Sequence, residues 1–437
     1  KTTLGIKIER QANDMARHGI SSENPEPLVS AFRPKSVVRP RIIYAGGEES
    51  MATKTLGIIL NGATGRICRT QHIRGGLAQI YAEGGLPVGD DVIMPRLLLA
   101  GRNEDRLADV AREFGIEEWT TDLDGALADP DFPVFFDAAA THLRLDTLNR
   151  AIDAGKHIYT EKPIAPSVEE GLALMRRADE KGLRHGAVED KLFLPGFRKL
   201  HNLVEQGFFG RIVGFRLEFG WWVFDGAEAE SQRPSWNYTK AGGGGLLSDM
   251  HPHWRYVIEG ILGPISRVAC SAWTAQPERI NEDGKRYDVD VEDATATLLE
   301  LESGARGSIL SSWARRVRGD DLVTFQIDGT DGSAVAGLRQ CWAQSAADTP
   351  RIEGFNMGPD AATMDFSADY DAQWTEVAET APYKNPYRFG WEGFIPHVVT
   401  GAPFAHDLAA GIRDVQLAEA SATASKDHSW VDLPVLA

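Results

Sequence analysis

From residue 55 to residue 188 the chain alternates short apolar runs with stretches whose apolar residues recur at helical spacing. The runs at residues 56–60, 97–100, 133–136, 157–160 and 184–188 are typical of buried parallel strands. The stretches at residues 104–114, 143–154 and 167–181 are typical of helices, and in the last of them Ser167 is followed by Glu170 at the spacing of a capping box. This alternation predicts strand–helix–strand units and therefore a parallel sheet of the α/β class.

The sequence pattern changes after residue 189, where longer β-type runs replace the alternation of short strands and helices. Such runs occupy residues 212–224, 265–273, 295–301, 307–313 and 322–328, and an alanine-rich helix is predicted at 408–425. We therefore predict three parts. Residues 1–50 form an N-terminal extension without periodicity, residues 51–188 a Rossmann dinucleotide-binding domain, and residues 189–437 an α+β domain with an open, mainly antiparallel sheet for substrate binding and oligomerisation.

The composition excludes several classes of partner. A formal net charge of −17 argues against nucleic acid and against an anionic membrane, because both attract basic surfaces. The 3 cysteines, Cys68, Cys270 and Cys341, are far apart and lack the spacing of a metal site or a disulfide framework. No apolar run approaches the roughly 20 residues that span a bilayer, and no signal-peptide core stands at the start. We therefore expect a cytoplasmic protein.

A glycine-containing turn follows the first predicted strand. Glycines there let the backbone turn tightly and approach a phosphate at the start of the next helix. The candidate residues for the dinucleotide are Gly62, Ala63, Thr64, Gly65, Arg66 and Ile67. Many strand–helix turns carry glycine for steric reasons alone, and Cys68 stands where the usual fingerprint has its third glycine. The surrounding strand–helix pattern nevertheless favours dinucleotide binding.

The end of the second long strand bears on the choice of cofactor. NAD sites usually place a carboxylate there for the ribose hydroxyls, whereas NADP sites place an arginine near the 2′-phosphate. This chain has Arg102 and Asn103 at that position and no acid. Arg102 could also be an ordinary solvated loop residue. We predict that both residues contact the cofactor and that NADP(H) is favoured over NAD(H).

The stretch from residue 154 to residue 163 ends in Glu161, Lys162 and Pro163. Proline pushes the residue before it out of the helical region, so Lys162 is expected at the end of a strand. In an open α/β sheet that end of the strands is where ligands bind. A lysine fixed there is a candidate for orienting and polarising a substrate oxygen.

A second cluster lies at residues 236–253, where a run of glycines precedes Asp249, His251 and His253. We expect Pro252 in the first turn of a helix that continues through residues 254–262, with the three side chains around its start. A carboxylate beside an imidazole supports acid–base work. A metal bound by the three residues and a purely structural pair of histidines are the alternatives, and we expect no metal because no fourth ligand is evident.

These motifs together are similar to the Gfo/Idh/MocA family of NAD(P)-dependent sugar and polyol oxidoreductases. The resemblance extends from about residue 55 to the C-terminus. It implies that residues 62–67 cradle the pyrophosphate, that Glu161 and Lys162 lie beside the cofactor, and that Lys162 also contacts the reacting hydroxyl. It further implies that His253 is the acid–base residue and Asp249 its partner carboxylate. Ala139 and Ala140 stand where the family usually has Thr-Pro, and His251 replaces a common glycine.

The function we predict is hydride transfer between a nicotinamide cofactor and a secondary hydroxyl or ketone of a sugar, polyol or related cyclic substrate. Catalysis is assigned to Lys162, His253 and Asp249, with a rate that rises with pH through an ionisation at roughly 6 to 7. Residues expected at the substrate are Lys162, Trp236, Tyr238, His251 and His253. An NAD-dependent glycosidase that oxidises the sugar transiently, and a non-catalytic cofactor-binding regulator, are the alternatives. We also expect a homo-oligomer, either a dimer or a tetramer.

Overall fold

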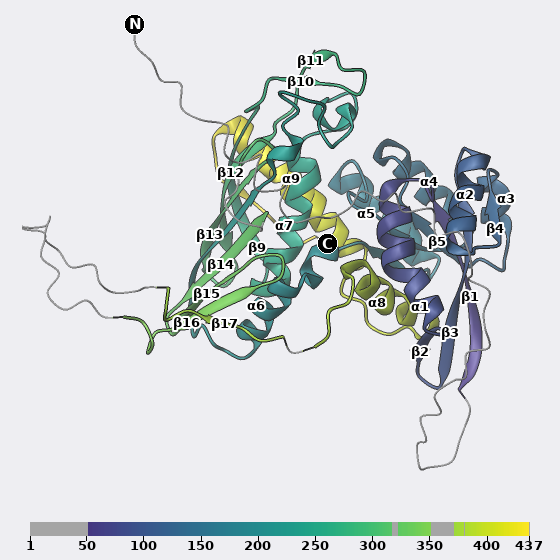
Figure 1. Cartoon of the computed structure of the whole chain (residues 1–437), viewed down its shortest axis with the longest axis horizontal. Coiled ribbons are helices and arrows are strands. Elements are labelled where there is room, and N and C mark those ends of the chain that lie inside the picture. The colour runs from purple at the N-terminus through teal and green to yellow at the C-terminus, as the bar shows by residue number, and fades with distance from the viewer. Residues whose placement is uncertain (1–50, 317–321, 351–370, 380, 437) are drawn as a thin grey trace, which may run out of the picture. The chain divides into compact units, whose positions relative to one another are not determined.

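The computed structural model describes residues 51–316, 322–350, 371–379 and 381–436. The predicted extension at residues 1–50 lies outside this part of the chain. Figure 1 shows two groups of elements after residue 50, one built on the sheet that contains β1 and the other on the sheet that contains β12. In the described ranges no helix has the length and the apolar character needed to cross a membrane.

The first sheet is a doubly wound parallel sheet. Its strands run in the order β2-β3-β1-β5-β6-β7, with β4 paired to β3, and the pair β2–β3 is antiparallel while the other pairs are parallel. The strands are β1 (Ala52–Asn61), β2 (Leu86–Val88), β3 (Asp91–Ala100), β4 (Glu118–Thr120), β5 (Val134–Asp137), β6 (His157–Thr160) and β7 (His185–Ala187). The order reverses between β1 and β5, so the ends of these two strands form the switch point at which such sheets bind ligands. The predicted α/β class is confirmed.

Helices connect the parallel strands, as the pattern predicted. They are the π-helix η1 (Ile67–Leu77), α1 (Ala78–Ala82), α2 (Glu104–Phe114), α3 (Leu123–Ala128), α4 (Thr141–Asp153) and α5 (Val168–Glu180). The predicted cap of α5 is present, because the Ser167 hydroxyl accepts a hydrogen bond from the Glu170 backbone N–H at 3.2 Å. Gly155 follows α4 with a φ of 75°, a conformation that glycine adopts without strain, and it ends the helix.

The second sheet has the strand order β17-β16-β15-β14-β8-β13-β12-β9-β18, and a two-stranded sheet pairs β10 with β11. The pair β8–β13 is parallel and the remaining pairs are antiparallel, which confirms the predicted mainly antiparallel sheet. The strands are β8 (Ile212–Gly220), β9 (Ile265–Trp273), β10 (Glu278–Ile280), β11 (Arg286–Asp288), β12 (Ala294–Leu301), β13 (Arg306–Ser312), β14 (Val323–Gly329), β15 (Gly332–Ala336), β16 (Cys341–Ser345), β17 (Thr375–Glu376) and β18 (Val431–Asp432).

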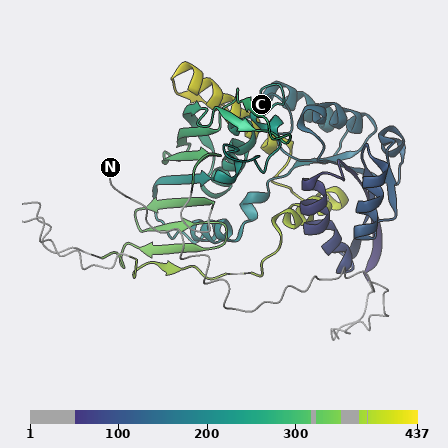
Figure 2. The same ribbon diagram turned by 45° about the horizontal axis from the view of Figure 1, so that its top comes forward.

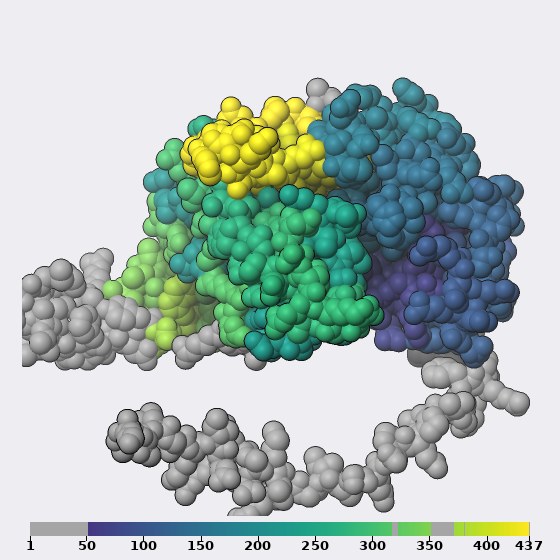
Figure 3. All heavy atoms as spheres, turned by 90° about the horizontal axis from the view of Figure 1, so that it is seen from above, coloured from purple at the N-terminus to yellow at the C-terminus, as the bar shows by residue number. Residues whose placement is uncertain are grey.

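Helices α7 (Leu246–Leu262) and α9 (Leu408–Asp427) lie along the second sheet (Figures 1 and 2). Shorter helices precede α7, namely η2 (Asp190–Phe193), α6 (Pro195–Glu205), η3 (Trp222–Phe224) and η4 (Ser235–Tyr238). Helix α9 also contacts α5 and β7 of the first group. Figure 3 shows the C-terminal residues in yellow, directly against the blue atoms of the first group. The C-terminal helix therefore joins the two groups of elements.

Helix α8 (Pro386–Thr400) packs on the first sheet, although it follows the second sheet in sequence. The side chains of Trp391, Phe394 and Ile395 are buried in one apolar cluster with Phe136 and Tyr159. The rings of Tyr159 and Phe394 stack with their centroids 4.6 Å apart. The prediction placed the whole of residues 189–437 in the second domain and did not foresee this return of the chain.

The predicted start of α7 is wrong. The helix begins at Leu246, so Pro252 lies inside it instead of in its first turn. Gly245 precedes the helix with a φ of 123°, and a Cβ atom on Gly244 would lie 2.1 Å from the Asn237 carbonyl oxygen. The Glu292 side chain accepts a hydrogen bond from the Leu247 N–H at 2.9 Å. The glycine run therefore lets the backbone before α7 lie directly against Asn237. The helix consequently begins about two turns earlier than the position of Pro252 suggested.

Candidate functional site

The glycine turn lies at the switch point of the first sheet. Gly62 has a φ of 79°, and a Cβ atom there would lie 2.8 Å from the backbone of Ala138 and Ala139 after β5. Gly62 therefore fits between the ends of β1 and β5 because it lacks a side chain. The segment continues with buried Ala63, half-buried Thr64 and Ile67, and exposed Gly65 and Arg66. This is the open backbone that a pyrophosphate needs, at the beginning of a helix.

A buried ion pair fixes the loops beside this turn. Asp137 at the end of β5 accepts hydrogen bonds from Asn61 Nδ2 at 2.8 Å and from Arg144 Nε at 3.0 Å. The same arginine donates to the carbonyl oxygens of Ala139 and Pro163. Arg144 thus ties the ends of β5 and β6 together, close to the predicted cofactor turn. This network was not predicted, although Asp137 directly follows the predicted strand at residues 133–136.

At the end of β3, the two residues predicted to contact the cofactor differ in whether their side chains already have a hydrogen-bond partner in the protein. Arg102 is exposed. Asn103 is the N-cap of α2, and its side-chain oxygen accepts a hydrogen bond from the Arg106 N–H at 2.9 Å. The Arg102 side chain therefore remains open to a ligand, whereas the side-chain oxygen of Asn103 is occupied by the helix.

Lys162 and Asp249 meet at the predicted catalytic position. Lys162 follows β6, as expected from Pro163, and its Nζ lies 2.6 Å from the Asp249 carbonyl oxygen and 2.8 Å from Asp249 Oδ1. Arg233 Nη1 lies 2.6 Å from Asp249 Oδ2. Burial alone would raise the pKa of Asp249, but the charges of Arg233 and Lys162 lower it to about 2. Asp249 is therefore ionised and held between two cations.

His253 lies one turn after Asp249 on α7 and is buried. Side chains four residues apart share one face of a helix, so His253 faces the same side as Asp249. Burial, followed by the charges of Lys162, Lys191 and Arg233, lowers the pKa of His253 well below its usual value. The expected ionisation at roughly 6 to 7 is therefore wrong for this environment, because the imidazolium is both desolvated and repelled.

Glu161 is held by His72, which Trp391 fixes in turn, and neither residue was predicted at the site. His72 Nε2 on η1 lies 2.8 Å from Glu161 Oε1, and the Trp391 indole N–H of α8 donates to His72 Nδ1 at 3.1 Å. His72 and Trp391 are both fully buried. Glu161, predicted to contact the cofactor, thus keeps a fixed orientation beside Lys162.

Two residues predicted at the substrate are placed elsewhere. His251 is fully buried, with Nδ1 3.1 Å from Ser421 Oγ on α9, because its side chain points to the opposite face of α7 from His253. Tyr238 is also fully buried, and its hydroxyl donates to the Phe224 carbonyl oxygen at 2.8 Å. Substrate contact is therefore wrong for both. Trp236 of η4 is 46% exposed and stays a candidate for stacking on a sugar ring.

The metal alternative finds no geometric support in the described ranges, where no group of three His, Cys, Asp or Glu side chains is arranged to hold an ion. Asp249 and His253 share a helix face, but His251 points away from them. Asp249 is instead neutralised by Lys162 and Arg233, which leaves it poorly suited to a cation.

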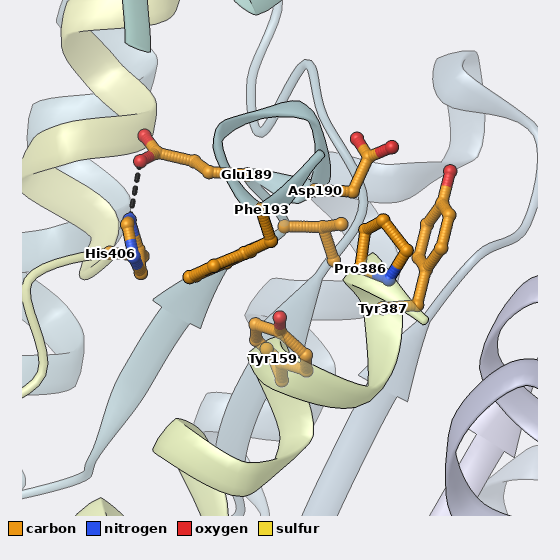
Figure 4. Close-up of a pocket in the computed structure, with 9 residues that line it drawn as sticks. Tyr159, Glu189, Asp190, Phe193, Pro386, Tyr387 and His406 are labelled. Atoms are coloured by element: carbon orange, nitrogen blue, oxygen red, sulfur yellow. Dashed lines mark hydrogen bonds and ion pairs between the residues drawn. The ribbon is translucent and has the colours of Figure 1, made fainter. Parts of the chain in front are cut away.

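Several further polar residues of the site went unrecognised in the sequence. Asp190 and Lys191 of η2 lie beside Tyr256 of α7, and Tyr387 of α8 reaches the same carboxylate. Figure 4 shows Asp190 and Tyr387 together at one side of a small crevice, with Glu189 and His406 paired at the other. Tyr256 could have been found, since it follows His253 by three residues and so shares its helix face.

Comparison with known proteins places these observations in a family. Residues 97–188 match the model of an oxidoreductase family with an NAD-binding Rossmann fold, GFO_IDH_MocA, and residues 197–335 match the GFO/IDH/MocA C-terminal domain. The chain is 42% identical over 387 residues to D-xylose dehydrogenase of Paenarthrobacter nicotinovorans, covering 87% of this chain and 98% of that protein.

More distant relatives agree. Levoglucosan dehydrogenase of Pseudarthrobacter phenanthrenivorans is 27% identical, over 78% of this chain and 90% of its own. A solved structure of levoglucosan dehydrogenase in complex with NADH and levoglucosan superposes with a TM-score of 0.71 at 25% identity, covering 87% of this chain and 100% of the other. With both domains matched and a relative this similar along nearly its whole length, the chain belongs to the GFO/IDH/MocA family of oxidoreductases.

Proposed function

We propose that this protein is a dehydrogenase that transfers hydride between a nicotinamide dinucleotide and a secondary hydroxyl or ketone of a sugar or polyol. The observation that carries the proposal is the contact of Lys162 Nζ with Asp249, 2.8 Å from Oδ1, with His253 one turn further along the same helix. A cation and an imidazole are thereby held together at the carboxyl edge of the parallel sheet. Oxidation of an alcohol requires these two functions, one for the oxygen and one for its proton.

The residues divide the work according to their chemistry. Residues 62–67 would hold the pyrophosphate, and the bound cofactor supplies the hydride acceptor or donor. Lys162, kept in place by Asp249, orients the substrate oxygen and stabilises negative charge on it. His253, neutral because of its environment, accepts the hydroxyl proton during oxidation and returns it during reduction.

The substrate class follows from the relatives together with the side chains near the site. One relative is a D-xylose dehydrogenase and another a levoglucosan dehydrogenase, and both names denote compact, ring-forming sugars. The exposed indole of Trp236 suits the apolar C–H face of such a ring. D-xylose is therefore the first substrate to test, because the relative that is 42% identical is named a D-xylose dehydrogenase.

For the cofactor we propose a preference for NADP(H) over NAD(H), on the grounds that Arg102 is exposed at the end of β3 without a carboxylate beside it in the strand-end turn. An arginine there can pair with the 2′-phosphate, and the absence of an acid removes the usual partner of the ribose hydroxyls. The solved levoglucosan dehydrogenase is a complex with NADH. A preference for NADP(H) would therefore distinguish this chain from that relative.

We also propose a homo-oligomer and a cytoplasmic location. The outer face of the second sheet carries a groove of about 640 Å³ in which Leu298 is 54% exposed, and a second copy would cover such a face. Three free cysteines, of which two are buried, agree with a reducing compartment.

The test of the proposed function is a screen that follows the absorbance of the reduced nicotinamide. D-xylose, other free pentoses and hexoses, polyols and aryl glycosides are each offered with NAD⁺ and with NADP⁺. We expect cofactor reduction with one or more free sugars and its loss in His253→Ala. The matched control is His251→Gln on the opposite face of α7. Release of the aryl alcohol without net cofactor reduction would instead identify the glycosidase, and cofactor binding without either reaction would identify the regulator.

A further inference from the structure

Asp190 is the centre of a buried group of hydrogen bonds beside His253. Its Oδ2 lies 2.9 Å from Lys191 Nζ, and its Oδ1 accepts a hydrogen bond from the Tyr256 hydroxyl at 3.0 Å. Burial alone would raise the pKa of Asp190, but Lys191 and the Tyr256 hydrogen bond lower it, so the side chain is an anion that only accepts. Figure 4 shows the carboxylate pointing to the same side as the hydroxyl of Tyr387.

The Tyr256 hydroxyl donates its hydrogen bond to Asp190. A phenol carries a single proton, and here it is donated to Asp190 Oδ1. The Tyr256 hydroxyl oxygen in turn accepts a hydrogen bond from the Lys191 backbone N–H at 3.1 Å. Burial and the charge of Asp190 raise the pKa of Tyr256 well above its usual value, so the phenol keeps its proton.

His253 must therefore be the donor in its contact with Tyr256. Its Nδ1 lies 2.7 Å from the Tyr256 oxygen, which has no second proton to give. A neutral imidazole has one N–H, and when that N–H is on Nδ1 the lone pair is on Nε2. The hydrogen-bond pattern thus leaves Nε2 as the basic nitrogen.

We infer that Tyr256 and Asp190 are positioning residues that hold His253 in the tautomer whose Nε2 accepts the substrate proton. The inference rests on the proposed function. In the oxidation step the hydroxyl O–H bond breaks and its proton bonds to Nε2. The C–H electron pair leaves as hydride for the oxidised nicotinamide, and the remaining O–H pair forms the C=O bond. The imidazolium keeps its Nδ1 proton in the hydrogen bond to Tyr256, whose hydroxyl donates to the Asp190 anion, and it releases the substrate proton from Nε2.

The charges around His253 agree with this assignment. The cations Lys162, Lys191 and Arg233 lower the pKa of His253, in addition to its burial, and keep the resting imidazole neutral. The anions nearby are Asp190, 3.9 Å from Nδ1, and Asp249 one turn earlier. Because Asp190 faces the Nδ1 side, it favours a proton on that nitrogen over one on Nε2.

The first experiment reads the tautomer directly in the cofactor-free protein. Nitrogen-15 NMR of histidine-labelled protein distinguishes a protonated Nδ1 from a protonated Nε2, and His253→Gln identifies the His253 signal among those of the 11 histidines. We expect the proton on Nδ1 in the parent and a shift of population toward Nε2 in Tyr256→Phe. A proton on Nε2 in the parent would overturn the inference.

The second experiment measures turnover and its pH profile. Tyr256→Phe should lower kcat about 10-fold or more with little change in cofactor affinity, a smaller loss than the roughly 10²–10⁴-fold expected for the base itself. Asp190→Asn should lower it at least as far, because an amide can donate to Tyr256 and let the phenol turn its proton to Nδ1. The double variant should be little worse than the worse single one.

The controls separate this inference from the proposed function. Tyr287→Phe, on the β10–β11 sheet, tests whether loss of any partly buried phenol has the same effect, and we expect parent kinetics. Parent turnover and an unchanged pH profile in Tyr256→Phe would overturn the positioning role and leave His253 as the base. Parent turnover in His253→Gln would instead remove His253 as the base, and absence of cofactor reduction with every sugar offered to the parent would overturn the proposed function itself.

Discussion

Replacing Asp249 with asparagine tests how strongly the site depends on one half-buried carboxylate. The side chain is 21% exposed and lies 2.8 Å from Lys162 Nζ and 2.6 Å from Arg233 Nη1. Burial opposes ionisation, yet the two cations lower the pKa of Asp249 from 3.8 to about 2. That drop corresponds to a preference of about 2.5 kcal/mol for the ionised form in the folded protein.

The direction of the pH dependence follows from the lowered pKa. Because the folded pKa lies below the unfolded one, the stabilisation is complete above pH about 4 and is lost as the pH falls toward about 2. Asp249→Asn should therefore lower the free energy of unfolding by about 2–4 kcal/mol. The upper part of this range arises because Lys162 and Arg233 keep their charges without a partner. The loss should be the same at every pH between 5 and 8.

Urea unfolding followed by tryptophan fluorescence measures this difference, with midpoints compared at matched slopes. The control is Asp153→Asn, which removes a 61% exposed carboxylate from an ion pair with Arg177 and should leave the unfolding midpoint almost unchanged, because solvent screens the pair. A loss in Asp249→Asn no greater than in this control would refute the account of the site as a partly buried ion cluster. So would a loss that varies between pH 6 and 8.

Four further measurements test the remaining assignments. His253→Ala should lower kcat about 10²–10⁴-fold and leave cofactor affinity near the parent value in equilibrium titrations. Oxidation by the parent should stay constant as the pH falls from 8 to 6, because burial and three cations lower the pKa of His253, and a midpoint at the usual value of about 6.5 would contradict this. Arg102→Ala should weaken NADPH binding and spare NADH, whereas equal parent affinities for the two would refute the preference. Light scattering at micromolar concentration should report a dimer or a larger assembly, and Leu298→Glu in the sheet groove should shift it toward monomer.

Local patterns accounted for most of the strands and helices, since burial on one or both faces sets the spacing of apolar residues. The limits of β9, Ile265–Trp273, and of β6, His157–Thr160, match the predicted runs. Helix α8 was missed because it is apolar on several sides and contains Pro396, so it shows no helical period. Its place is set by Trp391 in a core whose strands lie far earlier in the chain, and such contacts leave no local pattern.

The residues proposed for the site could be selected from the sequence where each has a local signal, such as Pro163 after Lys162. Their partners were missed because the contacts span long separations. Asp190 and Tyr256 are 66 residues apart, and Glu161 and His72 are 89 apart. His251 was misplaced because the start of α7 was predicted too late. In a helix that already includes residue 249, positions 251 and 253 face opposite sides.

Helix α8, where the chain comes back to the first sheet, supports two carboxylates of the proposed site, Glu161 and Asp190. Trp391 donates only, so His72 must present an unprotonated Nδ1 to it and donate from Nε2 to Glu161. From the same helix Tyr387 reaches Asp190, and burial together with that carboxylate raises the pKa of Tyr387 well above its usual value. Helix α8 thus orients the carboxylate beside Lys162 and contacts the one that sets the tautomer of His253. Packing of α8 on the first sheet is therefore a condition for the site, because without it Asp190 loses Tyr387 and His72, which holds Glu161, loses Trp391.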